Sequence, residues 1–153
     1  MEKRQNPSGV AVLIVEDEFL LREFAADILA DNGFSVFQAR DAGQALVVLD
    51  EHPEIEILFT DINMPGSMDG LGLAREVARR YPAIHRLITS GRMNISAADA
   101  LRGGMRFIQK PYMPRDVVQT IREMLAGGED RSESRGGAPG GSYRSAWPDG
   151  HPA

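Results

Sequence analysis

The sequence predicts an α/β fold built on a five-stranded, doubly wound parallel sheet, with helices on both faces. Short apolar runs alternate five times with stretches of helical periodicity along the chain. The first run, residues 10–15, is continuously apolar, which is typical of a strand covered on both faces. Glycine or proline follows the helical stretches, where each helix must end.

The first two strand–helix units occupy the chain up to Pro53. Residues 10–15 and the half-apolar residues 34–39 are the expected strands. The first helix is predicted by apolar side chains at helical spacing, namely Leu20, Leu21, Phe24, Ile28 and Leu29, with Gly33 after its last turn. Asp41 followed by Gln44 is a capping-box signal for a second helix that ends near residue 50.

Three further units complete the expected sheet. Residues 55–60, 85–90 and 106–109 are the predicted strands. A helix from about residue 71 has its apolar stripe at Leu73, Ala74, Val77, Ala78 and Tyr81, and Pro82 stops it. The fourth helix, residues 97–102, is expected to be shortened or irregular because Gly103 and Gly104 interrupt it. Pro114 begins the last helix, whose apolar face is Val117, Val118, Ile121, Met124 and Leu125.

Length and composition predict one domain with two polar ends. A chain of 153 residues can form one core without cross-links. We expect the domain over residues 10–126, after a flexible N-terminal arm of residues 1–9. Residues 127–153 are rich in Gly, Pro and Ser and cannot bury enough apolar area to offset the entropy of ordering, which predicts a disordered tail.

Composition also excludes several classes of function. Without cysteine there is no disulfide, thiolate nucleophile or cysteine-bound zinc. No apolar stretch approaches the roughly 20 residues of a membrane span, so a soluble, cytoplasmic protein is expected. The net charge of -5 argues against nucleic-acid binding. His52, His85 and His151 lack metal-ligand spacing and are interpreted as structural or solvent residues.

Reactive side chains stand at the carboxyl ends of four expected strands. These residues are Glu16 and Asp17, then Asp61, then Ser90 with Gly91, and finally Lys110. In an open parallel sheet the carboxyl ends form the ligand-binding edge. Taken singly, Asp61 could be a turn residue, and Glu16 and Asp17 could cap a helix. Their joint occurrence at one edge favours a site.

This set of groups fits phosphoryl transfer assisted by Mg²⁺. Clustered carboxylates repel one another unless a cation lies among them, and oxygen ligands without His or Cys favour Mg²⁺. Lys110 and Ser90 would contact the phosphoryl oxygens. The backbone amides after Asp61 and Ser90, at Asn63 and Gly91, would add donors. Asp61 is then the nucleophile.

Four pieces of the chain together resemble the response-regulator receiver domain of two-component signalling, which has a flavodoxin-like fold. They are residues 13–18 (Leu-Ile-Val-Glu-Asp-Glu), 60–66 (Thr-Asp-Ile-Asn-Met-Pro-Gly) with Asp69-Gly70, 89–91 (Thr-Ser-Gly) and 107–111 (Phe-Ile-Gln-Lys-Pro). The resemblance implies that Asp61 accepts a phosphoryl group from a sensor histidine kinase or a histidine phosphotransfer protein.

The resemblance also assigns roles to the residues around Asp61. It implies Mg²⁺ bound by Asp17, Asp61 and the Asn63 carbonyl, with Glu16 acting mostly through water. Ser90 and Phe107 would be the switch residues, with Thr89 as the alternative hydroxyl. Lys110 would pair with the phosphoryl group, and the Lys110–Pro111 bond would be cis.

The sequence departs from the receiver pattern in three places. The loop after Asp61 is one residue longer than the commonest form, which should alter that turn without moving Asp61. Phe107 has no hydroxyl. The interval from Ser90 to Lys110 is slightly short, so the family's usual dimer is not expected to carry over.

The resulting hypothesis is a stand-alone receiver that signals through a downstream protein partner, without contact to nucleic acid or membrane. Its only catalysis would be its own phosphorylation and slow dephosphorylation. One alternative is a receiver-like interaction module that works without phosphorylation. Another is a phosphatase with Asp61 as nucleophile, which Asn63 disfavours because its amide cannot replace the second carboxylate such enzymes use as general acid.

Overall fold

The computed structural model describes residues 9–91 and 104–134, with side chains described as far as residue 127. All five expected strands lie within these residues. The elements are β1 (Ala11–Val15), α1 (Phe19–Asp31), β2 (Ser35–Ala39), α2 (Ala42–Glu51), β3 (Ile55–Asp61), α3 (Gly70–Arg80), β4 (His85–Ser90), β5 (Arg106–Gln109) and α5 (Pro114–Ser134). The irregular helix expected at residues 97–102 lies outside the described part of the chain.

The strands form one parallel sheet in the order β2-β1-β3-β4-β5. The chain runs from β1 outward to β2 and then returns past β1 to β3. The direction of winding therefore reverses between β1 and β3, which is where open α/β sheets bind ligands. The predicted doubly wound α/β fold is confirmed, and its order is that of flavodoxin-like proteins.

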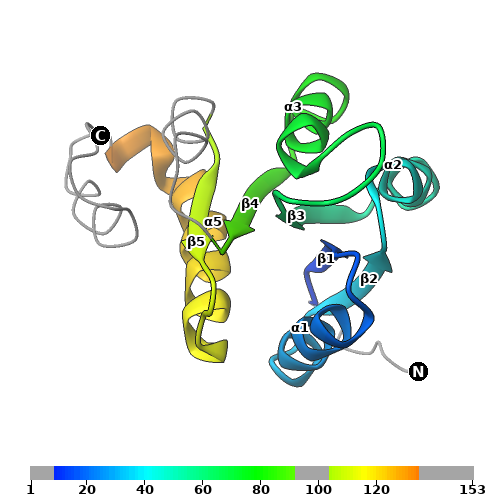
Figure 1. Ribbon diagram of the computed structural model, residues 1–153. Coiled ribbons are helices and arrows are strands. Elements are labelled where there is room, and N and C mark those ends of the chain that lie inside the picture. The colour runs from blue at the N-terminus through cyan, green and yellow to red at the C-terminus, as the bar shows by residue number, and fades with distance from the viewer. Residues whose placement is uncertain (1–8, 92–103, 135–153) are drawn as a thin grey trace.

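Two apolar clusters hold helices against opposite faces of the sheet. One contains side chains of α2 and α3, together with Leu13, Leu58 and Ile88 from the strands. The other contains side chains of α1 and α5, together with Ile14 and Leu87. Figure 1 shows α2 and α3 on the upper side of the sheet and α1 on the opposite side. Because both faces are covered, the whole of β1 is buried.

Local sequence signals place the helix ends as expected. Asp41 accepts a hydrogen bond from the Gln44 amide at 2.8 Å, and the Gln44 side chain accepts one from the Arg40 amide at 2.8 Å. This reciprocal pair is the predicted capping box at the start of α2. Gly33 follows α1 with φ of 91°, a backbone conformation that glycine adopts without strain.

The last helix is longer than the sequence indicates. α5 continues to Ser134, through residues that the composition assigned to a disordered tail. That assignment considered only buried apolar area, whereas a helix also extends through its own backbone hydrogen bonds without burying side chains. The helix therefore extends past residue 126, whereas the domain boundary expected there stays a prediction. The remaining tail, residues 135–153, and residues 1–8 of the predicted arm lie outside the described residues.

Candidate functional site

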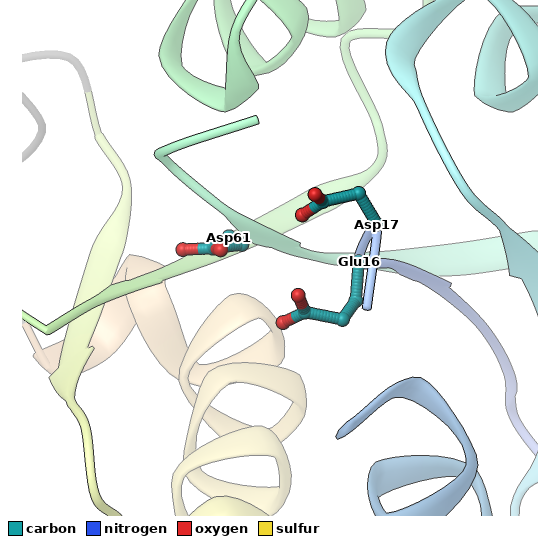
Figure 2. Close-up of side chains that lie close together, drawn as sticks. All are labelled: Glu16, Asp17 and Asp61. Atoms are coloured by element: carbon teal, nitrogen blue, oxygen red, sulfur yellow. The ribbon is translucent and has the colours of Figure 1, made fainter. Parts of the chain in front are cut away.

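The acidic side chains predicted at two strand ends meet at the carboxyl edge of the sheet. Glu16 and Asp17 follow β1, and Asp61 is the last residue of β3. β1 and β3 are direct neighbours, with Val15 paired to Thr60. Carboxylate oxygens of the three residues all lie within 4.8 Å of one another. Figure 2 shows the three side chains extending from the two strand ends toward the same side.

Lys110 brings a positive charge to this acidic group from the end of β5. Its Nζ lies 3.2 Å from Glu16 Oε1 and 3.4 Å from Asp61 Oδ2. Glu16 and Asp61 are each only 7% exposed, whereas Asp17 is exposed. The Lys110–Pro111 peptide is cis, as the receiver resemblance implies. Four of the predicted site residues, from the ends of β1, β3 and β5, therefore lie close together at one edge of the sheet.

Burial changes the proton affinity of these groups. Desolvation raises the pKa of Asp61 above its ordinary value, although Lys110 opposes the change. Desolvation likewise raises the pKa of Glu16, again against the influence of Lys110. For Lys110 burial alone would lower the pKa, but Asp61 and Glu16 outweigh it and the pKa is raised. Burial therefore makes the ionised forms of Asp61 and Glu16 less favourable, and Lys110 offsets this effect only in part.

The donor set fits a hard divalent cation. All three side chains offer carboxylate oxygens, and their separation within 4.8 Å is close to the roughly 4 Å across an octahedral Mg²⁺ shell with bonds of about 2.1 Å. Burial raises the pKa values of Glu16 and Asp61 because their ionised forms are poorly solvated there. A cation bound by oxygen ligands would stabilise those ionised forms.

The predicted switch hydroxyl and its alternative lie on opposite faces of β4. Ser90 is fully buried, and the Asn63 side-chain amide donates to its Oγ at 3.4 Å. Thr89 is the register partner of Asp61 on the neighbouring strand. Its buried hydroxyl has no hydrogen-bond partner within the described parts of the chain. The contact with Asn63 favours Ser90 as the hydroxyl that faces the loop after Asp61.

One of the two predicted backbone donors contacts the Asp61 carboxylate, and the other directly follows β4. The Asn63 amide donates to Asp61 Oδ1 at 3.4 Å, so it already faces the carboxylate. Gly91 is exposed in the bend directly after β4, and a Cβ built there would meet nothing within 4 Å. Both positions leave a backbone amide near the carboxyl edge of the sheet.

Phe107, the predicted aromatic switch residue, is buried inside the protein. It is 2% exposed, and it belongs to the apolar cluster that also contains Ile88. Phe107 and Ile88 are register partners on β5 and β4. Ser90 follows Ile88 by two residues, so Ser90 and Phe107 lie on the same face of the sheet. Ser90 and Phe107 therefore lie on one face of two neighbouring strands.

Two residues near the site are missing from the set predicted from the sequence. Tyr112 packs its ring against Phe59 with centroids 5.8 Å apart, and burial raises its pKa, with Lys110, Glu16 and Asp61 as charged neighbours. Arg22 of α1 donates to the backbone carbonyl of Glu16 at 2.9 Å. Tyr112 could have been noticed from its place two residues after Lys110. The Arg22 contact depends on how α1 packs and has no local signal.

Comparison with known proteins identifies the family. The model of the response regulator receiver domain matches residues 12–122. The chain belongs to this family. The match includes all of the strand ends described above, so the receiver resemblance of the sequence is confirmed.

Similar receivers are found in regulators and in a kinase. The chain is 40% identical over 118 residues to a putative NtrX-like response regulator of Rickettsia bellii, with 75% of this chain and 24% of the relative covered. It is 33% identical over 129 residues to the sensor kinase CckA of Brucella abortus, with 82% and 14% covered. The chain therefore spans only about a quarter or less of these relatives.

Solved structures show the same fold. The receiver domain of NtrX from Brucella abortus is 32% identical and superposes with a TM-score of 0.70, covering 75% of this chain and 98% of that one. A CheY-like receiver protein from Methanospirillum hungatei is 26% identical with a TM-score of 0.73, covering 80% and 98%. The receiver here thus matches nearly the full length of known receiver domains.

No helix in the described parts of this receiver is both long enough and apolar enough to cross a membrane. The 21-residue α5 has the necessary length, but its sequence carries many charged residues.

Proposed function

We propose that this receiver is a phosphorylation-controlled switch in which Asp61 is the phosphoryl acceptor. The observation that carries the proposal is the position of the Asp61 carboxylate, buried at a strand end 3.4 Å from the Lys110 ammonium and beside two further carboxylates. The phosphodonor is a phosphohistidine of a sensor histidine kinase or histidine phosphotransfer protein. A cytoplasmic location belongs to the same proposal.

In this reaction an Asp61 oxygen attacks the phosphorus of phosphohistidine. The P–N bond breaks as the O–P bond forms, and the imidazole leaves with the electron pair and takes up one proton. Glu16, Asp17, Asp61 and the Asn63 carbonyl would hold Mg²⁺, which when bound supplies positive charge to the phosphoryl oxygens. Lys110 pairs with the same oxygens, and the amides of Asn63 and Gly91 donate to them.

The output of the switch is carried by Ser90 and Phe107. Ser90 moves toward the phosphoryl group, and the buried Phe107 responds on the neighbouring strand. The partner that reads this change is a protein. The relation to a kinase receiver such as that of CckA supports a histidine kinase as donor, and the family supports the switch.

Phosphorylation is tested by intact mass. Incubation with Mg²⁺ and acetyl phosphate, or with a phosphorylated histidine kinase, should add about 80 Da, the mass of one phosphoryl group, and EDTA should prevent the addition. Asp61→Asn should abolish the adduct because it removes the nucleophile. Asp27→Asn, at an exposed position on α1, is the matched control and should leave the adduct unchanged.

A wild-type protein that stays unmodified with both donors would refute the proposed switch. Turnover of many equivalents of an organic phosphate without a stable adduct would instead support a phosphatase. Capture of a partner that is equally strong for wild type and Asp61→Asn would support a phosphorylation-independent module.

A further inference from the structure

The loop between β1 and α1 is held by a side chain from α1. Arg22 Nη1 donates to the backbone carbonyl of Glu16 at 2.9 Å. This carbonyl belongs to the peptide that joins Glu16 to Asp17, so the bond restrains the backbone that carries both acidic side chains. Asp17 is exposed, and packing alone therefore restrains it less than it restrains Glu16.

Arg22 is itself fixed by β2, the edge strand that contributes no group to the phosphoryl site. Its Nε donates to Gln38 Oε1 at 3.1 Å, and its guanidinium lies 5.5 Å from the centre of the Phe19 ring. The next residue of β2, Ala39, accepts a hydrogen bond from the Glu16 amide at 3.1 Å. The end of β2 thus holds the amide of Glu16 directly and its carbonyl through Arg22.

We propose that Arg22 and Gln38 are positioning residues for the divalent cation bound by the acidic loop. This inference rests on the proposed function, because it concerns the Mg²⁺ of that site. Arg22 acts through the 16–17 peptide, which it orients so that the Glu16 and Asp17 carboxylates face Asp61. Gln38 acts one step further away by fixing the guanidinium.

The direction in which the Kd for Mg²⁺ changes when Arg22 is substituted distinguishes a positioning role from an effect of its charge alone. A guanidinium near a cluster of carboxylates repels a dication, so removing its charge favours Mg²⁺ binding if charge alone matters. Loss of a group that orients ligands has the opposite effect and typically weakens metal binding by about 10-fold or more. The two explanations therefore predict changes in Kd of opposite direction.

Calorimetric titration of the full chain with MgCl₂ tests the proposal. Arg22→Met should raise the Kd for Mg²⁺ by about 10-fold. Gln38→Leu should raise it by less, whereas Gln38→Glu should keep the wild-type value or lower it slightly, because its carboxylate still accepts from Arg22 Nε and adds negative charge. Arg40→Met is the control, since it removes an equal charge from the exposed residue after β2 and should leave Kd unchanged or slightly lower.

A Kd for Arg22→Met that is unchanged or lower than that of wild type would overturn the proposal. Independent effects of Arg22→Met and Gln38→Leu in the double variant would also overturn it, because residues acting in one chain of contacts must be non-additive.

Hydrogen exchange without metal gives a second measurement. The Asp17 and Glu18 amides should exchange faster in Arg22→Met than in wild type, while the β3 amides keep their rates. Unchanged rates for Asp17 and Glu18 would refute the positioning role. Absence of Mg²⁺ binding by wild type would instead refute the metal step of the proposed function, and the exchange rates would still decide whether Arg22 orders the loop.

Discussion

Asp61 and Glu16 are buried carboxylates that share the ammonium of Lys110. Their pKa values are raised because burial disfavours the charged form more than Lys110 favours it. A carboxyl group with a raised folded pKa binds more protons in the folded than in the unfolded state just above its ordinary pKa. Stability is therefore lost as pH rises through that window.

Asp61→Asn should remove this loss in metal-free protein. Its free energy of unfolding should exceed that of wild type by an amount that grows as pH rises above about 4, the ordinary pKa of Asp, because only wild type must ionise a buried carboxyl at position 61. The raised pKa of Lys110 contributes stability that is lost only above a pH of about 10 and does not alter this window.

Urea unfolding in EDTA at several pH values measures the difference. Asp27→Asn, on the exposed side of α1, should show no such pH-dependent gap from wild type. If the difference in free energy of unfolding between Asp61→Asn and wild type is the same at every pH, burial does not raise the pKa of Asp61 as described.

At the scale of elements, the backbone at the start of α3 closely approaches the backbone at the end of β3. The Gly70 amide donates to the Ile62 carbonyl at 2.9 Å. A Cβ at position 70 would lie 1.8 Å from the Asp61 carbonyl oxygen, a backbone atom that cannot rotate away. The absence of a side chain at Gly70 therefore permits the approach of α3 to the strand end that carries Asp61.

Gly70→Ala should lower the free energy of unfolding by about 3 kcal/mol, because the backbone must move to admit the methyl group. It should also slow phosphorylation of Asp61, which shares the displaced backbone. Gly43→Ala in α2 is the control, since its Cβ would be 3.6 Å from the nearest atom. Alanine is the better helix former there and should raise stability by about 0.5 kcal/mol.

Chemical denaturation and the initial rate of phosphorylation measure both effects of Gly70→Ala. If Gly70→Ala has the wild-type free energy of unfolding and the wild-type rate of phosphorylation, α3 can move to admit the methyl group without loss of stability.

At the scale of the whole molecule, the acidic site links folding to metal concentration. A ligand that binds only the folded state raises stability by about 2.7 kcal/mol at 100 times its Kd. Burial is the main cause of the raised pKa of Asp61, and the charge of Asp17 adds to the rise, so Asp17 contributes repulsion when no cation is present. The melting temperature of the receiver should therefore rise with Mg²⁺.

Asp17→Asn should raise the melting temperature in EDTA and abolish its increase with Mg²⁺, because the substitution removes both the repulsion and a ligand. Differential scanning calorimetry with EDTA and with MgCl₂ measures the two effects. An equal Mg²⁺-dependent rise in Asp17→Asn and wild type would exclude Asp17 as a ligand.

Sequence by itself determined the α/β alternation and the groups at the strand ends. Apolar periodicity and caps such as Asp41–Gln44 are local, so they can be read without a structure. Parallel strands also bring their carboxyl ends to one edge, so Asp17, Asp61 and Lys110 were expected together before any distance was known.

Only the tertiary structure decided the order of the strands, the face occupied by Ser90 and the support of the acidic loop by β2. These features depend on register and on packing between residues far apart in the chain, such as Arg22 and Gln38. The length of α5 was also known only from the structure. Amino-acid composition indicates how much apolar area a segment can bury, but it does not indicate how far the backbone hydrogen bonds of a helix extend.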